Sequence, residues 1–184
     1  MALKHCTRSR ANALLWAAVA IGAPCIVTAQ SITEYDIPTA NSHPFGITAG
    51  PDGALWFTEW VGNKIGRVTL EGSFTEFRLP NPRSTPIWIK AGPDGALWFT
   101  EQDGNRIGRI TTSGAIQEFP LPTPGSRPWD ICVGPDGALW FTEKSSLQIG
   151  RITTGGQLTE YATPASPWDL TAGPDGATSG SPSG

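Results

Sequence analysis

The sequence predicts an all-β protein built from one repeated unit, and three observations indicate it. The decapeptide Gly-Pro-Asp-Gly-Ala-Leu-Trp-Phe-Thr-Glu begins at Gly50, Gly92 and Gly134, so the repeat is 42 residues long. The chain of 184 residues contains 22 Gly and 17 Pro, which punctuate it at short intervals. Apolar residues show no helical periodicity after the N-terminal segment. Frequent turn residues between short apolar runs are typical of short β-strands.

Each repeat divides into four strands separated by turns. Pro51-Asp52-Gly53 favours a tight turn, because Pro fixes φ and Gly tolerates positive φ. The second segment is apolar on both faces, as expected for a strand between two layers, whereas the fourth is more polar, as expected at an outer edge. In the first repeat we therefore expect strands at 44–49, 54–59, 64–69 and 73–79.

Four short strands in about 42 residues define one blade of a β-propeller. Gly-Pro-Asp-Gly-Ala returns at Gly173 after a shorter loop and opens a fourth copy. A lone strand is expected at Ser31–Pro38, because this segment has the pattern of a fourth strand with no blade before it. Residues 30–177 are thus predicted to form a partial ring of about 3.5 blades, fewer than the roughly four to eight of closed rings.

Residues 1–29 have the pattern of a secretory signal peptide. Lys4, Arg8 and Arg10 precede an uncharged apolar stretch at 13–27, and Val27-Thr28-Ala29 fits a small-residue cleavage site. We expect cleavage after Ala29 and a secreted or periplasmic protein that has no membrane attachment once cleaved. An uncleaved N-terminal anchor is the alternative.

The last seven residues, 178–184, depart from the repeat. Where the other copies have Leu-Trp-Phe-Thr-Glu, the chain has Thr-Ser-Gly-Ser-Pro-Ser-Gly. A Gly/Ser-rich end is typical of a disordered tail. The same heptapeptide can also be encoded by DNA whose shifted frame reads Leu-Trp-Phe-Thr-Glu-Trp, the sequence found at 55–60. We therefore expect an out-of-frame tail that truncates a longer propeller, with a disordered tail as the alternative.

Composition and charge exclude some classes of partner. The formal net charge is −3, and an acidic chain does not attract nucleic acid. Cys6 and Cys25 lie in the predicted signal peptide, so Cys132 has no partner for an internal disulfide and is expected to be a buried, unreactive thiol. The open blade faces of a partial ring predict self-association.

The decapeptide, the later Gly-Asn-Lys/Arg-Ile-Gly-Arg and the final Glu-Phe-x-Leu-Pro together resemble the virginiamycin B lyase (streptogramin B lyase) family, over residues 31–177. The resemblance implies a seven-bladed propeller and a magnesium-dependent elimination that opens the ester of a cyclic depsipeptide antibiotic. It also implies a site from the late blades, with a His after the Pro that opens a first strand, a Glu before that Pro, and a Glu ending a second strand. A six-bladed lactonase-like or NHL-like propeller is the alternative.

This chain matches the implied site only in part. The position after the Pro is never His, and holds Phe45, Ile87, Trp129 and Trp168. The position before the Pro is never Glu, and holds His43, Thr85, Arg127 and Ser166. The family's general base is therefore absent from these repeats. The catalytic residue stays unassigned, with His43 as a candidate whose Ser-His-Pro loop is more typical of a surface histidine.

Loops before first strands and after second strands open on the same face of a propeller. Ligand-binding residues are expected there, namely Arg127, Trp129, Asp130, Trp168 and Asp169; the two Trp could instead pack between blades. The candidate ligands for Mg²⁺, which prefers carboxylate oxygens, are Glu59, Glu101 and Glu143. As the alternative, each Glu pairs across its hairpin with a cation, respectively Lys64, Arg106 or Lys144. The mid-strand Trp56, Trp98 and Trp140 are expected in the core.

These expectations define two functions. In the first, the full-length parent is a metal-dependent C–O lyase for cyclic depsipeptides or related esters, with Mg²⁺ as the implied cofactor and this chain alone inactive. In the second, the protein is a non-catalytic extracellular propeller that binds a small ligand or another protein.

Overall fold

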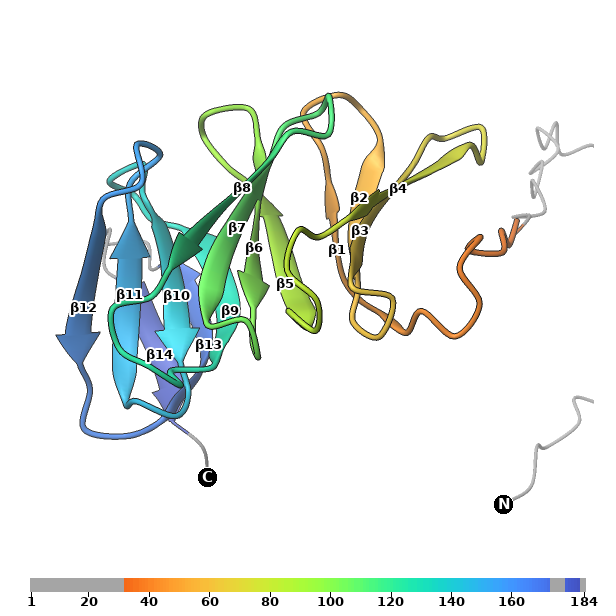
Figure 1. Cartoon of the computed structure of the whole chain (residues 1–184). Helices are drawn as coiled ribbons and strands as arrows, with labels where there is room; N and C mark the ends of the chain where they lie inside the picture. The colour runs from red at the N-terminus through yellow and green to blue at the C-terminus, as the bar shows by residue number, and fades with distance from the viewer. Residues whose placement is uncertain (1–31, 173–177, 183–184) are drawn as a thin grey trace, which may run out of the picture. The chain divides into compact units, whose positions relative to one another are not determined.

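The computed structural model describes residues 32–172 and 178–182 (Figure 1). The chain divides into two compact units, residues 1–34 and 35–184, and all strands of the described residues lie in the second. The predicted signal peptide at 1–29 lies outside the described residues. Within them, no helix is long and apolar enough to cross a membrane.

Three antiparallel four-stranded sheets follow one another along the chain, and each is formed by four consecutive strands (Figure 1). The predicted all-β class and the four-stranded repeat are thereby confirmed. The strands are β1 (Pro44–Ala49), β2 (Leu55–Glu59), β3 (Lys64–Val68), β4 (Phe74–Arg78), β5 (Pro86–Ala91), β6 (Leu97–Glu101), β7 (Arg106–Ile110), β8 (Ile116–Pro120), β9 (Pro128–Val133), β10 (Leu139–Glu143), β11 (Gln148–Ile152) and β12 (Leu158–Ala162).

Residues 178–182 of the tail form a strand. This strand, β14 (Thr178–Pro182), pairs antiparallel with β13 (Pro167–Ala172). Gly180 pairs with Leu170, in the register that pairs Phe141 with Ile131 in the third blade. The backbone of β14 therefore occupies the place of the second strand of a fourth blade.

The lone strand predicted at Ser31–Pro38 is absent from the described part of that segment, so this prediction was wrong. A fourth strand needs the third strand of its own blade as a hydrogen-bond partner, and the described chain offers none before β1. The Tyr35 ring nevertheless lies against Gly72, as the Phe77 ring of the first blade lies against Gly114 of the second. Tyr35 thus occupies the place of a fourth-strand aromatic from a preceding blade.

The repeated Asp, Trp and Arg form one cluster in each blade. In the second blade, Trp98 Nε1 donates to Asp94 Oδ1 at 3.0 Å and Arg109 Nε donates to Asp94 Oδ2 at 2.7 Å. The Arg109 guanidinium also lies 5.8 Å from the centre of the Trp98 ring. The same contacts recur in the third blade, where the Trp140 and Arg151 donors lower the pKa of Asp136 to about 2. In each blade, this cluster therefore links the turn between the first and second strands to the third strand.

The hydrophobic core lies between consecutive blades. A Phe from each second strand covers the glycine of Ile-Gly-Arg, and a Cβ at Gly108 would lie 2.1 Å from the Phe99 ring. Glycine is therefore required there by close packing. The first interface joins Trp56, Ile65 and Leu79 to Ile89, Leu97 and Phe99, and the second joins Trp98, Ile107 and Leu121 to Ile131, Leu139 and Phe141.

The repeated Thr of the second strands links neighbouring blades. Thr100 is fully buried, and its Oγ1 accepts a hydrogen bond from Trp88 N at 3.1 Å and donates one to Trp129 O at 2.8 Å. Trp88 N lies at the bulge of β5, where the ladder with β6 is interrupted. The hydroxyl thus gives a hydrogen-bond partner to the backbone N–H at the bulge of one blade and to a backbone carbonyl of the next blade.

Thr100→Val should lower the free energy of unfolding by about 2–4 kcal/mol, because it leaves a partly buried N–H and a partly buried C=O without partners. Urea denaturation measures this loss. Thr100→Ser keeps the hydroxyl and removes one methyl group, so it should cost only about 1 kcal/mol. Equal losses in the two variants would show that the hydroxyl bonds contribute nothing.

The outer face of the first blade is exposed. Ile47 is 58% exposed, whereas Ile89 and Ile131, its equivalents in the next two blades, are completely buried. An apolar groove of about 390 Å³ lies on this face, with Phe57 and Phe74 among its lining residues. The first blade therefore presents the same surface that the second and third blades bury against their predecessors.

Candidate functional site

The beginnings of the first strands place a row of aromatic side chains side by side. Phe45 of β1 makes edge contacts with Trp88 of β5 and Trp129 of β9, each at 5.5 Å between ring centres. Trp129 contacts Trp168 of β13 at 6.0 Å. The Trp168 side chain is 39% exposed and Phe45 is 42% exposed. We call Phe45, Trp88, Trp129 and Trp168 the aromatic row; Phe45 and Trp168 are its exposed members, and Trp88 and Trp129 are partly buried.

Lys144 lies over two rings of this row. Its Nζ is 3.4 Å from the centre of the Trp168 ring and 4.1 Å from that of Trp129. Burial, together with the nearby charge of Arg127, lowers the pKa of Lys144. The expectation that Lys144 pairs with Glu143 is wrong, because the electron-rich ring faces hold the ammonium group instead.

The predicted ligand-binding residues do not act as one group. Arg127 is exposed and points its Nη2 at Asp103 Oδ1, 3.4 Å away. Asp130 accepts hydrogen bonds from the backbone nitrogens of Ile131 and Leu170, both at 2.8 Å, so its carboxylate joins β9 to β13. Burial nevertheless raises the pKa of Asp130. Asp169 is exposed. Only Trp129 and Trp168 of the five predicted residues belong to the aromatic row.

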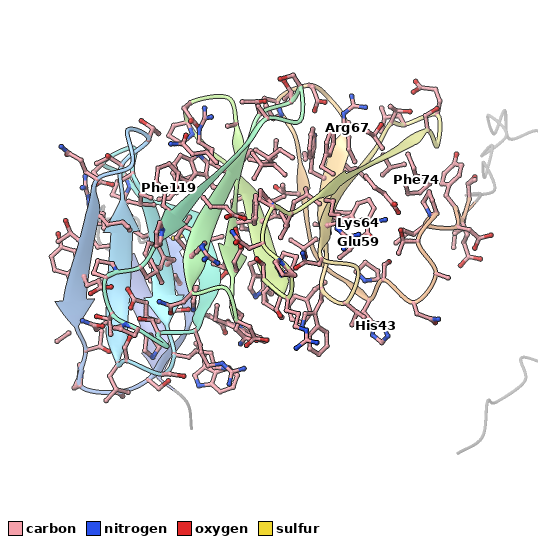
Figure 2. The ribbon with its side chains drawn as sticks, viewed as in Figure 1. His43, Glu59, Lys64, Arg67, Phe74 and Phe119 are labelled. Carbon is pink, nitrogen blue, oxygen red and sulfur yellow. The ribbon has the colours of Figure 1, made fainter. Side chains whose placement is uncertain are left out.

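His43 lies at the end of the first blade, on the loop that precedes β1 (Figure 2). It is exposed, its φ is 52°, and its ring makes an edge contact with Trp60 at 6.3 Å. No hydrogen bond of its side chain occurs within the described residues. This is the surface position that its Ser-His-Pro loop predicts.

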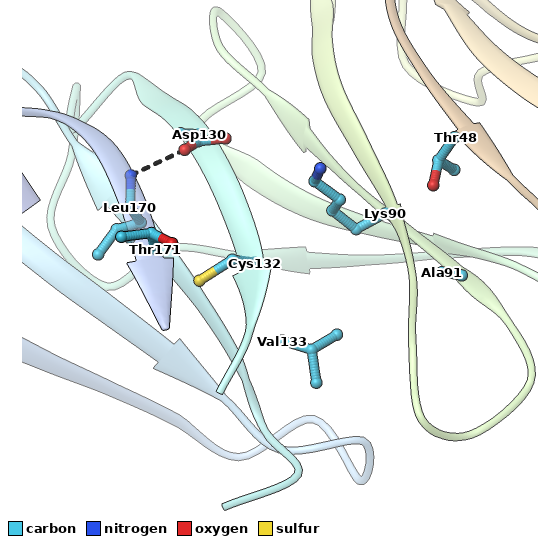
Figure 3. Close-up of a pocket in the computed structure, with 8 residues that line it drawn as sticks. All are labelled: Thr48, Lys90, Ala91, Asp130, Cys132, Val133, Leu170 and Thr171. Atoms are coloured by element: carbon cyan, nitrogen blue, oxygen red, sulfur yellow. Dashed lines mark hydrogen bonds between the residues drawn. The ribbon is translucent and has the colours of Figure 1, made fainter. Parts of the chain in front are cut away.

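A pocket of about 440 Å³ opens along the middle of the first strands (Figure 3). Its lining includes Lys90, Asp130 and Cys132, and the hydrogen bond from Leu170 N to Asp130 closes one side. Burial raises the pKa of the Cys132 thiol to about 11, so the thiol is protonated at neutral pH. The thiol is only partly buried, whereas the sequence predicts a buried one, but its raised pKa agrees with the predicted low reactivity.

The three predicted metal ligands are buried in three separate blades. Glu59, Glu101 and Glu143 have no exposed surface. Both carboxylate oxygens of Glu59 and of Glu101 have no hydrogen-bond partner, whereas Glu143 Oε2 accepts from Ser146 Oγ at 3.0 Å. Ser84 lies beside Glu101, but its hydroxyl donates to Asn81 O. Burial raises the pKa of all three carboxyl groups, and that of Glu101 reaches about 7.

The alternative of hairpin ion pairs is also wrong. Lys64 binds Glu76 of β4, with Nζ and Oε2 2.6 Å apart. The partner of Lys64 in the β2–β3 ladder is instead Glu59, and both of these residues are labelled in Figure 2. Glu76 competes successfully because it also accepts two hydrogen bonds from Thr39, on the segment before β1. Arg106 likewise lies 4.0 Å from Glu118 of β8.

These residues do not fit a magnesium site. Among residues 32–172, no group of three or more His, Cys, Asp and Glu side chains lies close enough together to hold a metal ion. A divalent cation needs several converging oxygen ligands, and the three glutamates lie in different sheets.

The raised pKa of Glu101 predicts a pH-dependent stability. The carboxyl group keeps its proton up to about pH 7 in the folded chain, whereas its ordinary pKa is 4.5. Stability from this group is complete below pH 4.5 and is lost as the pH rises towards 7, by on the order of 3 kcal/mol. Glu101→Gln should flatten this part of the curve of unfolding free energy against pH. An unchanged slope between pH 4.5 and 7 would contradict the assignment.

Comparison with known proteins agrees with this architecture. The Virginiamycin B lyase family model matches residues 9–179. A virginiamycin B lyase from Staphylococcus aureus is 45% identical, with a TM-score of 0.77 over 82% of this chain and 59% of that one. A catalytically inactive histidine-to-alanine variant from the same organism, solved with quinupristin, is 44% identical, with a TM-score of 0.76 over the same shares.

A curated virginiamycin B lyase from Bacillus licheniformis is 52% identical over 41 residues, which are 22% of this chain and 14% of that protein. The chain thus spans less than two thirds of the length of these relatives. The fold and the repeat define a β-propeller of four-stranded blades, with aromatic side chains at the beginnings of the first strands. The chain belongs to the virginiamycin B lyase family.

Sequence reasoning missed Trp88 and Lys144 as members of the site. Trp88 stands one residue beyond the position after the Pro, where the β5 bulge turns it towards Phe45. Lys144 follows a second strand at the position held by Trp60 and Gln102 in the earlier repeats. This departure from the repeat is the signal that could have identified it.

Proposed function

We propose that this chain is the first part of a secreted propeller whose complete ring is a C–O lyase for cyclic depsipeptides, and that it contacts the ligand without supplying the base. The observation that supports this most is the aromatic row. Indole and phenyl rings that are partly open to solvent suit the apolar and aromatic side chains of a cyclic peptide. Family membership supplies the reaction class.

The reaction requires a base that the described first strands do not contain. In the elimination, a base removes the α-proton, the electron pair forms a C=C bond, and the C–O bond of the ester breaks. Phe45, Ile87, Trp129 and Trp168 occupy the family's histidine position, and none accepts a proton. In the proposal, the base and the ligands of Mg²⁺ therefore come from blades that this chain lacks.

The register of β14 supports the proposed frameshift. Thr178, Ser179, Gly180 and Pro182 pair as Leu139, Trp140, Phe141 and Glu143 do in the third blade. The nucleotide sequence beyond codon 184 should encode further 42-residue repeats in another frame, and their blades would cover the open face at Ile47. A downstream sequence without such repeats in any frame would refute the frameshift.

Mass spectrometry of exported protein should find Gln30 as the first residue.

The absence of a base at the four Pro-Xaa positions favours a second candidate, a propeller that binds a ligand without chemistry. Both candidates predict binding, so binding is tested first.

Titration with quinupristin should quench the tryptophan fluorescence of the full chain. Trp129→Ile, which introduces the residue of the preceding repeat, should weaken binding about tenfold, or about 1.4 kcal/mol. Leu70→Ser, in the turn at the opposite end of the first blade, is the control and should have no effect. Equal affinity in Trp129→Ile would refute the role of the aromatic row.

A further inference from the structure

A second pocket, of about 490 Å³, lies at the junction of the first and second blades. It is formed by the turn after β2, the loop between β4 and β5, and the turn after β6. Its lining includes Trp60, Arg78, Arg83, Thr85 and Asp103, none of which belongs to the aromatic row. We call it the junction pocket.

The junction pocket collects residues that depart from the repeat. Trp60 corresponds to Gln102 and Lys144 in the next two repeats, Arg78 to Pro120 and Ala162, and Arg83 to Gly125. The repeated residues build the blades, as the Asp-Trp-Arg cluster and the threonine links show. Three departures that meet in one pocket therefore have no counterpart in the scaffold of the other blades.

The charge of the junction pocket is positive. Asp103 is already engaged, because its Oδ2 accepts from Thr85 Oγ1 at 2.8 Å and its Oδ1 faces Arg127. Within the described part of the chain, the guanidinium groups of Arg78 and Arg83 form no ion pair and no hydrogen bond. Two unpaired guanidinium groups stand out in a chain with a net charge of −3. They leave the pocket ready for an anionic group.

An exposed ring surface and a loop with positive φ complete the pocket. Trp60 is 43% exposed, and His43 contacts its ring edge-on at 6.3 Å. Arg83 and Thr85 have φ values of 59° and 58°, which are unfavourable for side chains with a Cβ and especially for a β-branched residue. The hydrogen bond from Thr85 to Asp103 helps to hold this conformation. Positive φ values recur at the equivalent positions of the other blades, 52° at His43 and 54° at Arg127, so this conformation belongs to the blade scaffold.

We propose that the junction pocket binds an aromatic carboxylate. The guanidinium groups of Arg78 and Arg83 would bind the carboxylate, for which arginine has matching paired donors. The exposed face of Trp60 would stack on the aromatic ring. A volume of about 490 Å³ accommodates a ligand of one or two rings. This site is independent of the aromatic row and of the proposed lyase reaction.

The experiment is a titration of the full chain with 1-naphthoate, followed by calorimetry. The variants use residues from the neighbouring repeats, which the same fold already accommodates: Arg83→Gly, Arg78→Ala and Trp60→Gln. Arg83→Gly also relieves the positive φ, because Gly125 has a φ of 70° at the equivalent position. Each variant should weaken binding at least fivefold. Lys90→Gln, which removes a cation from a different pocket, should leave the affinity unchanged.

The neutral analogue 1-naphthalenemethanol and the ring-free anion acetate separate the two parts of the ligand. Each should bind at least tenfold more weakly than 1-naphthoate. No binding of 1-naphthoate, or the same affinity in the Arg78→Ala/Arg83→Gly double variant, would overturn the proposal. Equal binding of the neutral alcohol would also overturn it, because the arginines would then have no part in recognition.

Discussion

Replacing Trp98 by alanine should lower the free energy of unfolding by about 3–5 kcal/mol, a large part of the stability of an ordinary domain. Trp98 is fully buried, stacks on Phe119 at 5.6 Å and donates to Asp94. Its removal leaves a cavity between the second and third blades and frees one acceptor of the Asp94 carboxylate. Denaturation by urea, monitored by circular dichroism, measures the loss.

Trp140→Ala is the matched comparison for Trp98→Ala. Trp140 has the same neighbours within its blade, including a stacked Tyr161 at 5.6 Å, but it is only partly buried. Trp98 packs against Leu139 and Phe141 of the next blade, whereas β14 has Thr and Gly at the matching register positions. Trp140→Ala should therefore cost clearly less. Equal costs would show that contacts between blades contribute little.

Restoring the repeat in the tail should stabilise the chain by about 2–5 kcal/mol. The five residues 178–182 would be changed to Leu-Trp-Phe-Thr-Glu. In the register of β14, the new Leu and Phe would lie in the strand positions that Leu139 and Phe141 occupy in the third blade, and would cover Trp140. Thermal and urea unfolding of both chains measures the gain.

A control separates this effect from added hydrophobicity. Ser179→Leu with Ser181→Phe adds the same side chains one position along, which places them on the opposite face of the strand. This variant should not be stabilised. If it gains as much as the restored tail, β14 does not occupy the place of a second strand.

The blades could be predicted from the sequence because their causes are local and repeated. The Pro-Asp-Gly turn and the apolar run after it fix the first hairpin, and the 42-residue spacing fixes the next blades. The lone strand at Ser31–Pro38 failed for a non-local reason, since its pattern was correct but its partner strand is absent from the described chain. A strand pattern indicates that a segment can form a strand, whereas pairing also requires a partner strand beside it.

The candidate site was predictable only in part, because its contacts join residues far apart in sequence. The spacing suggested that Lys64 would pair with Glu59. Lys64 instead binds Glu76, whose carboxylate also accepts a hydrogen bond from Thr39. Thr39 lies outside the hairpin, so no hairpin pattern could indicate its contribution. Lys144 and Trp88 join Trp129 and Trp168 only through packing across blades. The repeated residues proved to be scaffold, so the informative positions were those at which one repeat differs from the others.

The central claim is that this chain contributes ligand contacts but no general base. The full chain is incubated with quinupristin and magnesium, and the linear product is followed by chromatography. We expect no product above the protein-free control, because loss of a general base alone lowers the rate by about 10² to 10⁴. Turnover that stops when the metal is removed would contradict it, and His43→Ala would then show whether His43 is the missing base.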